Sequence, residues 1–234
     1  MNILAIGAHP DDLEMLCGGT LAKYAAQGHK VFMVHVSTGN VGHMVIPPEE
    51  LIKIRDREAR EAGILIGAEV ISLGEMDLFV RSENMKTRDK VIDVIRMAKP
   101  DIIITHNPHD YMDDHEETSR LVYEATMAAT VPHHKTEYPH YGKLTPLYYM
   151  EPAIGVNSCP EEYVDITEYI DIKLEMLGKH VSQHKWLFDH DGMDFLDLAR
   201  TLSRLRGYQC DTGHAEGFTS CRQYHKLSTR RLLP

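Results

Sequence analysis

Apolar and polar residues alternate along the first two thirds of this chain in two kinds of segment. Short apolar runs, typical of strands, lie at residues 2–6, 30–36, 69–72, 101–105 and 146–150. Between them, apolar residues recur every three or four positions, as in amphipathic helices, at residues 12–27, 49–66, 84–98 and 114–129. Strands separated by helices of this length predict βαβ units.

This succession predicts an α/β fold of the Rossmann-like, three-layer type with a mostly parallel sheet. Right-handed crossovers place the loops that follow strand C-termini on one edge of such a sheet, where these folds bind ligands. Two such loops are rich in His and Asp: residues 8–12 (AHPDD) and residues 106–115 (HNPHDYMDDH). We therefore expect the active site at the C-terminal edge of the strands.

The pattern is less regular after residue 130. Residues 132–145 predict a surface loop, and residues 166–182 predict a further helix. The tail from residue 207 to residue 218 is rich in glycine and polar residues, so we expect a loop there. No linker divides the chain, and we expect a single domain over residues 1–234.

Composition narrows the possible partners. With 25 Lys and Arg against 35 Asp and Glu, the chain has a net charge of −10. A nucleic-acid-binding protein needs a basic face to replace counterions, so this acidity argues against nucleic acid as a partner. The first apolar run is too short for a signal peptide or a membrane span. The four cysteines form no CxxC pair and indicate free thiols, so we expect a cytoplasmic protein without a membrane partner.

His9, Asp11 and Asp12 follow the first predicted strand directly and stand where a helix begins. Zinc binds imidazole and carboxylate ligands, and a catalytic site needs three of them with one open position. Asp12 also has a simpler interpretation, because a carboxylate at a helix N-terminus caps free N–H groups. Capping does not explain why His9 and Asp11 stand beside it.

A second cluster follows the buried strand at residues 101–105. Six of ten residues there are His or Asp: His106, His109, Asp110, Asp113, Asp114 and His115. Any single member could be a solvated loop residue. His115 is the best candidate for a metal ligand, because the adjacent Asp114 can orient its ring.

Several segments together resemble the PIG-L/LmbE-like deacetylases, zinc enzymes that remove acetyl groups from N-acetylglucosamine compounds and related substrates. The resemblance spans nearly the whole chain in order. It rests on Ala8-His9-Pro10-Asp11-Asp12-Leu13-Glu14, Gly18-Gly19-Thr20, Arg55-x-x-Glu58, Asp110-x-x-x-Asp114-His115, His180-x-Ser182-Gln183 and Ala215-Glu216-Gly217-Phe218.

The resemblance implies a role for each matching position. His9, Asp12 and His115 would bind Zn²⁺, with another divalent metal as the alternative. Asp11 would be the general base that takes a proton from the attacking water. Arg55 would lie near the acyl group of the substrate, although a helix pair with Glu58 three residues later explains it equally well.

One position departs from the family pattern. Many members carry a histidine three residues before the last metal ligand, and here that residue is Met112. A thioether can neither polarise a carbonyl nor protonate an amine. His109 is the nearest replacement in sequence, and Asp11 acting first as base and then as acid is the alternative.

The resemblance thus implies an N-deacetylase whose partner is a small N-acetylated molecule, and a chain that can form a homo-oligomer. Two rival functions stay open at this point. One is a different metal-dependent amidase or phosphoesterase on the same sheet edge. The other is a nucleotide- or ligand-binding module without catalysis, although the first turn lacks the GxGxxG that a dinucleotide requires.

Overall fold

The fold is built on one sheet, seen in a computed structural model that describes residues 1–155, 158–224, 226, 228 and 231–234. Seven strands in this part of the chain are arranged in the order β3-β2-β1-β4-β5-β7-β6. Their bounds are β1 (Asn2–Gly7), β2 (Lys30–Ser37), β3 (Glu69–Glu75), β4 (Ile102–Thr105), β5 (Leu147–Met150), β6 (Glu162–Asp165) and β7 (Ala215–Ser220). Strands β3, β2, β1, β4 and β5 pair in parallel, and β7 lies antiparallel to both β5 and β6.

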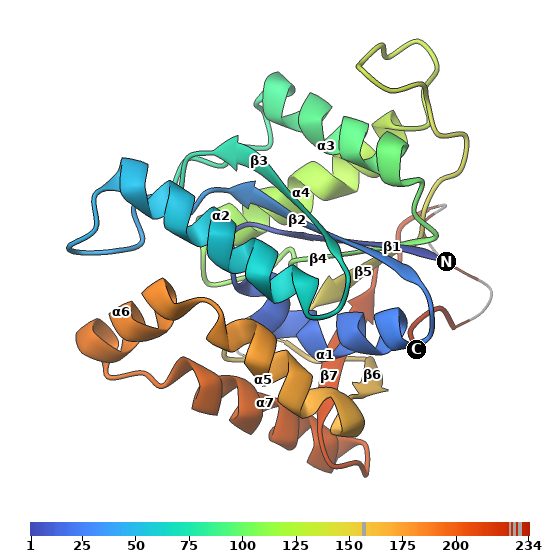
Figure 1. Cartoon of the computed structure of the whole chain (residues 1–234). Coiled ribbons are helices and arrows are strands. Elements are labelled where there is room, and N and C mark those ends of the chain that lie inside the picture. The colour runs from blue at the N-terminus through green and yellow to red at the C-terminus, as the bar shows by residue number, and fades with distance from the viewer. Residues whose placement is uncertain (156–157, 225, 227, 229–230) are drawn as a thin grey trace.

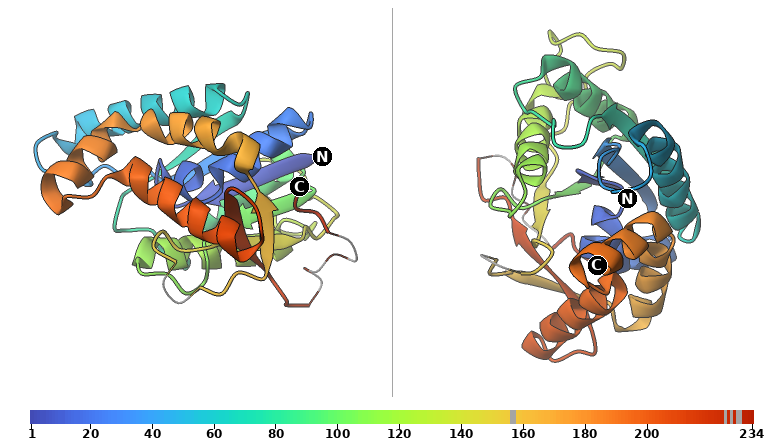
Figure 2. Two further views of the ribbon diagram at one scale, coloured as in Figure 1. Left: turned by 90° about the horizontal axis from the view of Figure 1, so that it is seen from below. Right: turned by 90° about the vertical axis from the view of Figure 1, so that its left-hand side faces the viewer.

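Helices cover both faces of the sheet and give the predicted three layers (Figures 1 and 2). One layer holds α3 (Met85–Ala98) and α4 (Asp113–Ala128). The other holds α1 (Asp12–Ala26), α2 (Pro48–Ile64), α5 (Ile170–Gly178) and α7 (Phe195–Gln209). A short 3-10 helix, η1 (Thr167–Tyr169), precedes α5, and α6 (Val181–Asp191) connects α5 to α7.

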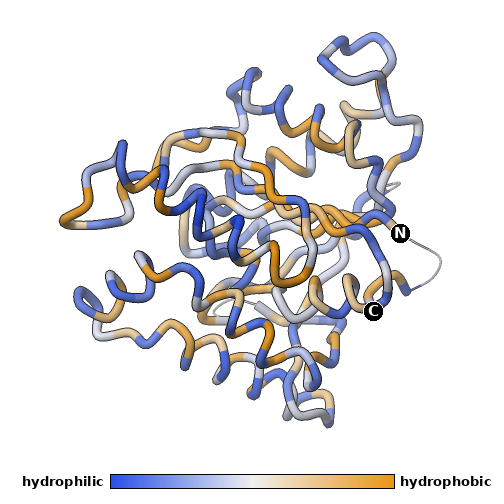
Figure 3. Tube along the Cα trace, in the orientation of Figure 1, coloured by the Kyte–Doolittle hydropathy of each residue, from blue (hydrophilic) through white to orange (hydrophobic). Residues whose placement is uncertain are grey.

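The central strands are buried on both sides, which explains why they appear in the sequence as continuous apolar runs. In β1, Ile3 and Ala5 pack into the core beneath α1 and α5. Leu4 and Ile6 alternate with them and pack into the core beneath α3 and α4. The Cα trace coloured by hydropathy shows the same apolar centre (Figure 3).

The predicted α/β fold with a mostly parallel sheet is confirmed, as are the strands and helices of the first two thirds. The helix predicted at residues 166–182 is interrupted, because α5 ends at Gly178 and α6 begins at Val181. The prediction of a loop over residues 207–218 is wrong. Residues up to Gln209 belong to α7, and Ala215–Ser220 form β7.

The prediction failed for β7 because a charged residue, Glu216, stands at a buried position of the strand. Its side chain accepts hydrogen bonds from Lys173 Nζ at 2.6 Å and from the backbone N–H groups of Gly19 and Thr20 at 2.9 and 2.7 Å. Glu216 and Lys173 are 3% and 2% exposed. A sequence pattern does not reveal a charge that is neutralised by a partner 43 residues away.

No helix in the described part of the chain is long and apolar enough to cross a membrane.

We predict that Lys173→Met lowers the free energy of unfolding by about 3–5 kcal/mol, because it leaves the buried Glu216 charge without its partner. Urea denaturation followed by circular dichroism measures this loss. The control is Lys30→Met, which breaks the exposed pair with Glu69 and should change stability by about 1 kcal/mol or less. Equal effects of the two substitutions would contradict the role given to the buried pair.

Candidate active site

The site lies where the order of the sheet reverses. The chain runs from β1 outward to β2 and β3, and then returns to place β4 on the other side of β1. The loops after β1 and β4 therefore start side by side and lead to helices on opposite faces of the sheet, α1 and α4. Open parallel sheets bind ligands between two such loops. These two loops carry the two His- and Asp-rich clusters.

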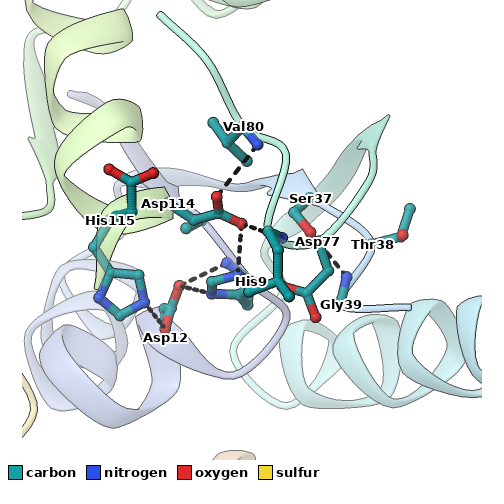
Figure 4. Close-up of polar contacts among 12 residues, drawn as sticks. His9, Asp12, Ser37, Thr38, Gly39, Asp77, Val80, Asp114 and His115 are labelled. Carbon is teal, nitrogen blue, oxygen red and sulfur yellow. Dashed lines mark hydrogen bonds and ion pairs between the residues drawn. The ribbon is translucent and has the colours of Figure 1, made fainter. Parts of the chain in front are cut away.

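His9, Asp12 and His115 come together there, as the sequence predicts (Figure 4). Each offers one ligand atom, and the three atoms lie within 4.8 Å of one another. Asp12 stands between the two rings, with one carboxylate oxygen 3.5 Å from His9 Nδ1 and the other 3.4 Å from His115 Nε2. All three residues are buried.

The carboxylate of Asp12 does not cap the helix that it begins. Its Oδ2 accepts a hydrogen bond of 2.6 Å from the backbone N–H of His9, which precedes the helix. The N-cap residue, Asp11, makes no capping hydrogen bond either. The carboxylates at the start of α1 are therefore turned toward the site rather than toward the first turn of the helix.

The second nitrogen of each histidine ring faces a carboxylate. His9 Nε2 lies 3.0 Å from Asp77 Oδ1 and 3.3 Å from Asp114 Oδ2. His115 Nδ1 lies 3.0 Å from Asp110 Oδ1. The expected pairing of Asp114 with His115 is thus replaced, because the side chain of Asp114 points from the first turn of α4 toward His9 (Figure 4).

Backbone contacts fix these orienting carboxylates. Asp114 accepts hydrogen bonds from the N–H groups of Leu78 at 2.7 Å and Val80 at 3.2 Å. These bonds attach the loop after β3, which carries Asp77, to the start of α4. Sequence reasoning missed Asp77, although its position just after the C-terminus of β3 was a usable signal.

Asp11 has an unusual backbone conformation. Its φ angle of 121° is strained for a residue with a side chain. Its Oδ2 accepts a hydrogen bond of 3.0 Å from Arg55, which is 3% exposed and also donates to the carbonyl of Gly39 at 3.2 Å. Strain of this kind is characteristic of functional sites, and here it points a carboxylate into the cavity.

The alternative pairing of Arg55 with Glu58 does not form. Glu58 accepts hydrogen bonds from the backbone N–H and the hydroxyl of Ser182, at 2.9 and 2.7 Å. Arg55 instead lines the cavity beside Asp11. His180, the first residue of the predicted His-x-Ser-Gln motif, is buried with its Nε2 3.2 Å from Glu14 Oε1, which fits a structural role.

The electrostatics of the site distinguish the two neighbouring aspartates. Burial raises the pKa of Asp11 to about 6, although Arg55 acts in the opposite direction. Burial would also raise the pKa of Asp12, but His115 and His106 hold it well below its usual value. Burial opposes protonation of His115, yet Asp12 and Asp110 raise its pKa to about 9. The carboxylate of Asp12 therefore holds its charge more readily than that of Asp11, and the cluster favours positive charge beside it.

Among the residues that the structure describes, three groups have ligand atoms close enough for a metal ion, and the surroundings of each group distinguish it from the others. His9, Asp12 and His115 all line a cavity of about 230 Å³. In the group of His9, Asp77 and Asp114, the carboxylate of Asp114 is already bonded to two backbone N–H groups. In the group of His106, Asp110 and His115, neither His106 nor Asp110 lines the cavity. The first group alone combines access with two rings that carboxylates orient through their other nitrogen, the usual support for metal-binding histidines.

The structure does not bring His109 into this cavity. His109 is exposed on the loop after β4, whereas Tyr111 and Met112, two and three residues later, line the cavity. Tyr111, which sequence reasoning did not select, lies with its ring edge toward His115 at a centroid distance of 5.4 Å. The opposite wall comes from the C-terminal helices and includes Gln183, Trp186 and Phe195.

This combination of fold and site defines a class of protein: an enzyme with a parallel α/β sheet, a His-Asp-His group that could hold a metal ion and opens to a cavity, and a second buried carboxylate beside it. The sequence profile of the PIG-L family, described as GlcNAc-PI de-N-acetylase, matches residues 4–126. The chain therefore belongs to the PIG-L family. The predicted resemblance and the predicted enzyme class, a deacetylase that hydrolyses amide bonds, are both confirmed.

The chain is similar to individual proteins over most of their length. The chain is 30% identical over 188 residues to the uncharacterized deacetylase YaiS of Escherichia coli, covering 77% of this chain and 91% of that protein. It is 25% identical over 231 residues to the diacetylchitobiose deacetylase of Thermococcus kodakarensis, covering 92% and 81%. The crystal structure of the 4-carboxy-2-hydroxymuconate hydratase GalB from Pseudomonas putida has the same fold, with a TM-score of 0.84, 24% identity and coverage of 99% and 100%.

We predict that Asp110→Asn weakens metal binding by about 10- to 100-fold, because the ring of His115 loses the carboxylate that orients it. Competition with a chelating dye measures the affinity. Asp113→Asn is the matched control, because Asp113 begins α4 three residues after Asp110 and its side chain is 72% exposed. Unchanged affinity in Asp110→Asn, or an equal loss in Asp113→Asn, would show that Asp110 does not support the metal ligands.

Proposed function

We propose that this chain is a zinc-dependent N-deacetylase of an N-acetylglucosamine-type sugar or conjugate. The observation that carries the proposal is the buried His9, Asp12 and His115 group, which opens to a cavity beside Asp11, whose carboxylate Arg55 holds. The names of the relatives support the substrate class, since diacetylchitobiose and an inositol-linked 2-acetamido sugar are among the compounds that they deacetylate.

Two imidazoles and one carboxylate suit zinc, and three protein ligands are the number that catalytic zinc sites use. His9 Nδ1, His115 Nε2 and the carboxylate of Asp12 would hold the ion, because carboxylates occupy the other ring nitrogens. When bound, the ion supplies Lewis-acid chemistry: it polarises the acetyl carbonyl and makes water more acidic.

Asp11 carries the proton in this proposal. Arg55 holds its Oδ2, so transfer falls to Oδ1, which takes a proton from the attacking water. The pKa of about 6 lets the carboxylate accept this proton near neutral pH and then give it up to the departing amine. The cleaved amide leaves acetate and a free amine. Arg55 keeps the carboxylate in place and would lie close to the acyl group of the substrate.

A second proton carrier is not required. Met112 stands at the position where many relatives carry a histidine, and its thioether cannot donate a proton. His109, the replacement suggested by the sequence, is exposed and lies outside the set of residues that line the cavity. We therefore assign both proton transfers to Asp11.

The proposed roles of the two aspartates separate in one experiment. Asp11→Asn should keep its zinc and lose activity by roughly 10²- to 10⁴-fold, the usual contribution of a positioned proton acceptor. Asp12→Asn should lose zinc and activity together, because a ligand is missing. Elemental analysis and enzymatic detection of acetate, with N-acetylglucosamine derivatives as substrates, measure the two properties.

His109→Ala is the control for this assignment and should retain nearly full activity. A loss comparable to that of Asp11→Asn would return the role of acid to His109. If Asp11→Asn released the zinc and Asp12→Asn kept it, the two aspartates would have each other's roles. If the zinc-loaded native protein released no acetate from any derivative, the proposed reaction itself would be wrong, and hydration, as in the similar GalB fold, would be tested next.

A further inference from the structure

A second and larger hollow adjoins the catalytic cavity. It has a volume of about 680 Å³, against about 230 Å³ for the catalytic cavity. One wall is the loop between β2 and α2 together with part of α2, and the other is α6; both lie on the same side of the molecule (Figures 1 and 2). We call it the α6 groove. Its apolar walls consist of Met44, Val45, Ile46, Ile54, Val181 and Trp186.

Trp186 lines both the α6 groove and the catalytic cavity, so the two spaces meet at its indole ring. The two walls are also connected directly, since Gln183 Nε2 donates a hydrogen bond of 3.1 Å to the carbonyl of Gly42. The rings of His43 and His190 flank the indole at centroid distances of 6.1 and 4.4 Å. A molecule whose reacting end occupies the catalytic cavity would therefore have to pass Trp186 to reach the groove.

The walls favour an apolar occupant over a second sugar. Met44, Val45 and Val181 are 70%, 84% and 62% exposed, which is unusual for neighbouring apolar side chains that line one hollow. The polar residues of the groove are largely engaged with each other. Glu58 is bonded to Ser182, and Lys185 Nζ lies 2.6 Å from Asp189. Few groups are left to bind the hydroxyls of a sugar.

We propose that the α6 groove binds an apolar group, an alkyl or aryl aglycone, carried by the N-acetylated sugar on which the enzyme acts. The inference rests on the proposed function and names its substrate more closely. The aglycone, rather than the acyl chain, reaches the groove because the acetyl carbon must lie at His9, Asp12 and His115 on the far side of Trp186. An acetyl group is too short to extend from there.

Trp186 is the only tryptophan of the chain, so its fluorescence reports on the groove directly. The experiment titrates zinc-loaded Asp11→Asn protein with the methyl, butyl and octyl glycosides of N-acetylglucosamine, below micelle-forming concentrations. We expect a blue shift with the longer chains and a dissociation constant that falls by roughly fourfold per buried methylene group. N,N'-diacetylchitobiose, which adds a second sugar, should bind no better than the methyl glycoside.

A matched pair of variants tests where the chain binds. Val45→Asp places a charge in the groove and should remove the gain from longer chains, while affinity for the methyl glycoside stays unchanged. Ile64→Asp is the control, because Ile64 is 73% exposed at the end of α2 and is not among the residues that line the groove. Ile64→Asp should retain the full dependence on chain length.

Equal dissociation constants for all three glycosides would overturn the inference, and so would tighter binding of diacetylchitobiose than of the octyl glycoside. Longer N-acyl chains that bind in place of longer aglycones would overturn it as well. Light scattering tests whether a second copy of this chain occupies the groove instead. If Val45→Asp converted an oligomer to monomers, the groove would be an interface between copies, and the inference would be overturned. These outcomes concern binding, whereas failure of the proposed function would appear as absence of acetate release by the native enzyme.

Discussion

Repulsion among buried carboxylates is the constraint on which the site depends. Four of them surround two imidazole rings at the ends of β1, β3 and β4, and the side chain of each is at most 10% exposed: Asp12, Asp77, Asp110 and Asp114. Buried anions are costly unless positive charge accompanies them. Protons on the histidines relieve part of this cost, and the carboxylates accordingly raise the pKa of His9 and His115. A divalent cation between the two rings relieves it with a fixed geometry.

The same charge distribution separates the functions of adjacent residues. Asp12 faces the two imidazoles and keeps its charge, whereas Asp11 faces Arg55 from a buried, strained position and has a raised pKa. In the proposed mechanism, the metal ligand Asp12 and the base Asp11 are thus adjacent residues of the sequence. The parallel sheet makes this possible, because the reversal of strand order places the loops after β1 and β4 side by side at one edge.

The sequence predicts the parts of the site that follow directly from strand order. His9, Asp12 and His115 follow β1 and β4 closely, so knowledge of the parallel sheet is enough to bring them together. Asp77 was missed because it approaches His9 through the path of an irregular loop after β3. Asp114 and His115 are consecutive residues of α4, so their side chains point about 100° apart, and Asp110, which precedes the helix, reaches the ring of His115 instead.

The features that the sequence did not predict depend on packing between residues far apart in the chain. The break between α5 and α6 and the buried charge of Glu216 depend on partners far away in the chain, so neither the end of α5 nor β7 had a local signature. Trp186 reaches the catalytic cavity only because α6 turns back over the loop before α2, which the Gln183 bond to Gly42 secures. The cavity wall opposite the metal ligands could therefore not be predicted.

The position of the metal tests this account most directly. Crystals grown with zinc, measured on both sides of the zinc absorption edge, locate the ion from its anomalous scattering. We predict one site within about 2.0–2.2 Å of His9 Nδ1, His115 Nε2 and a carboxylate oxygen of Asp12. An ion bound instead by His9 Nε2, Asp77 and Asp114, on the other side of the same ring, would contradict the account.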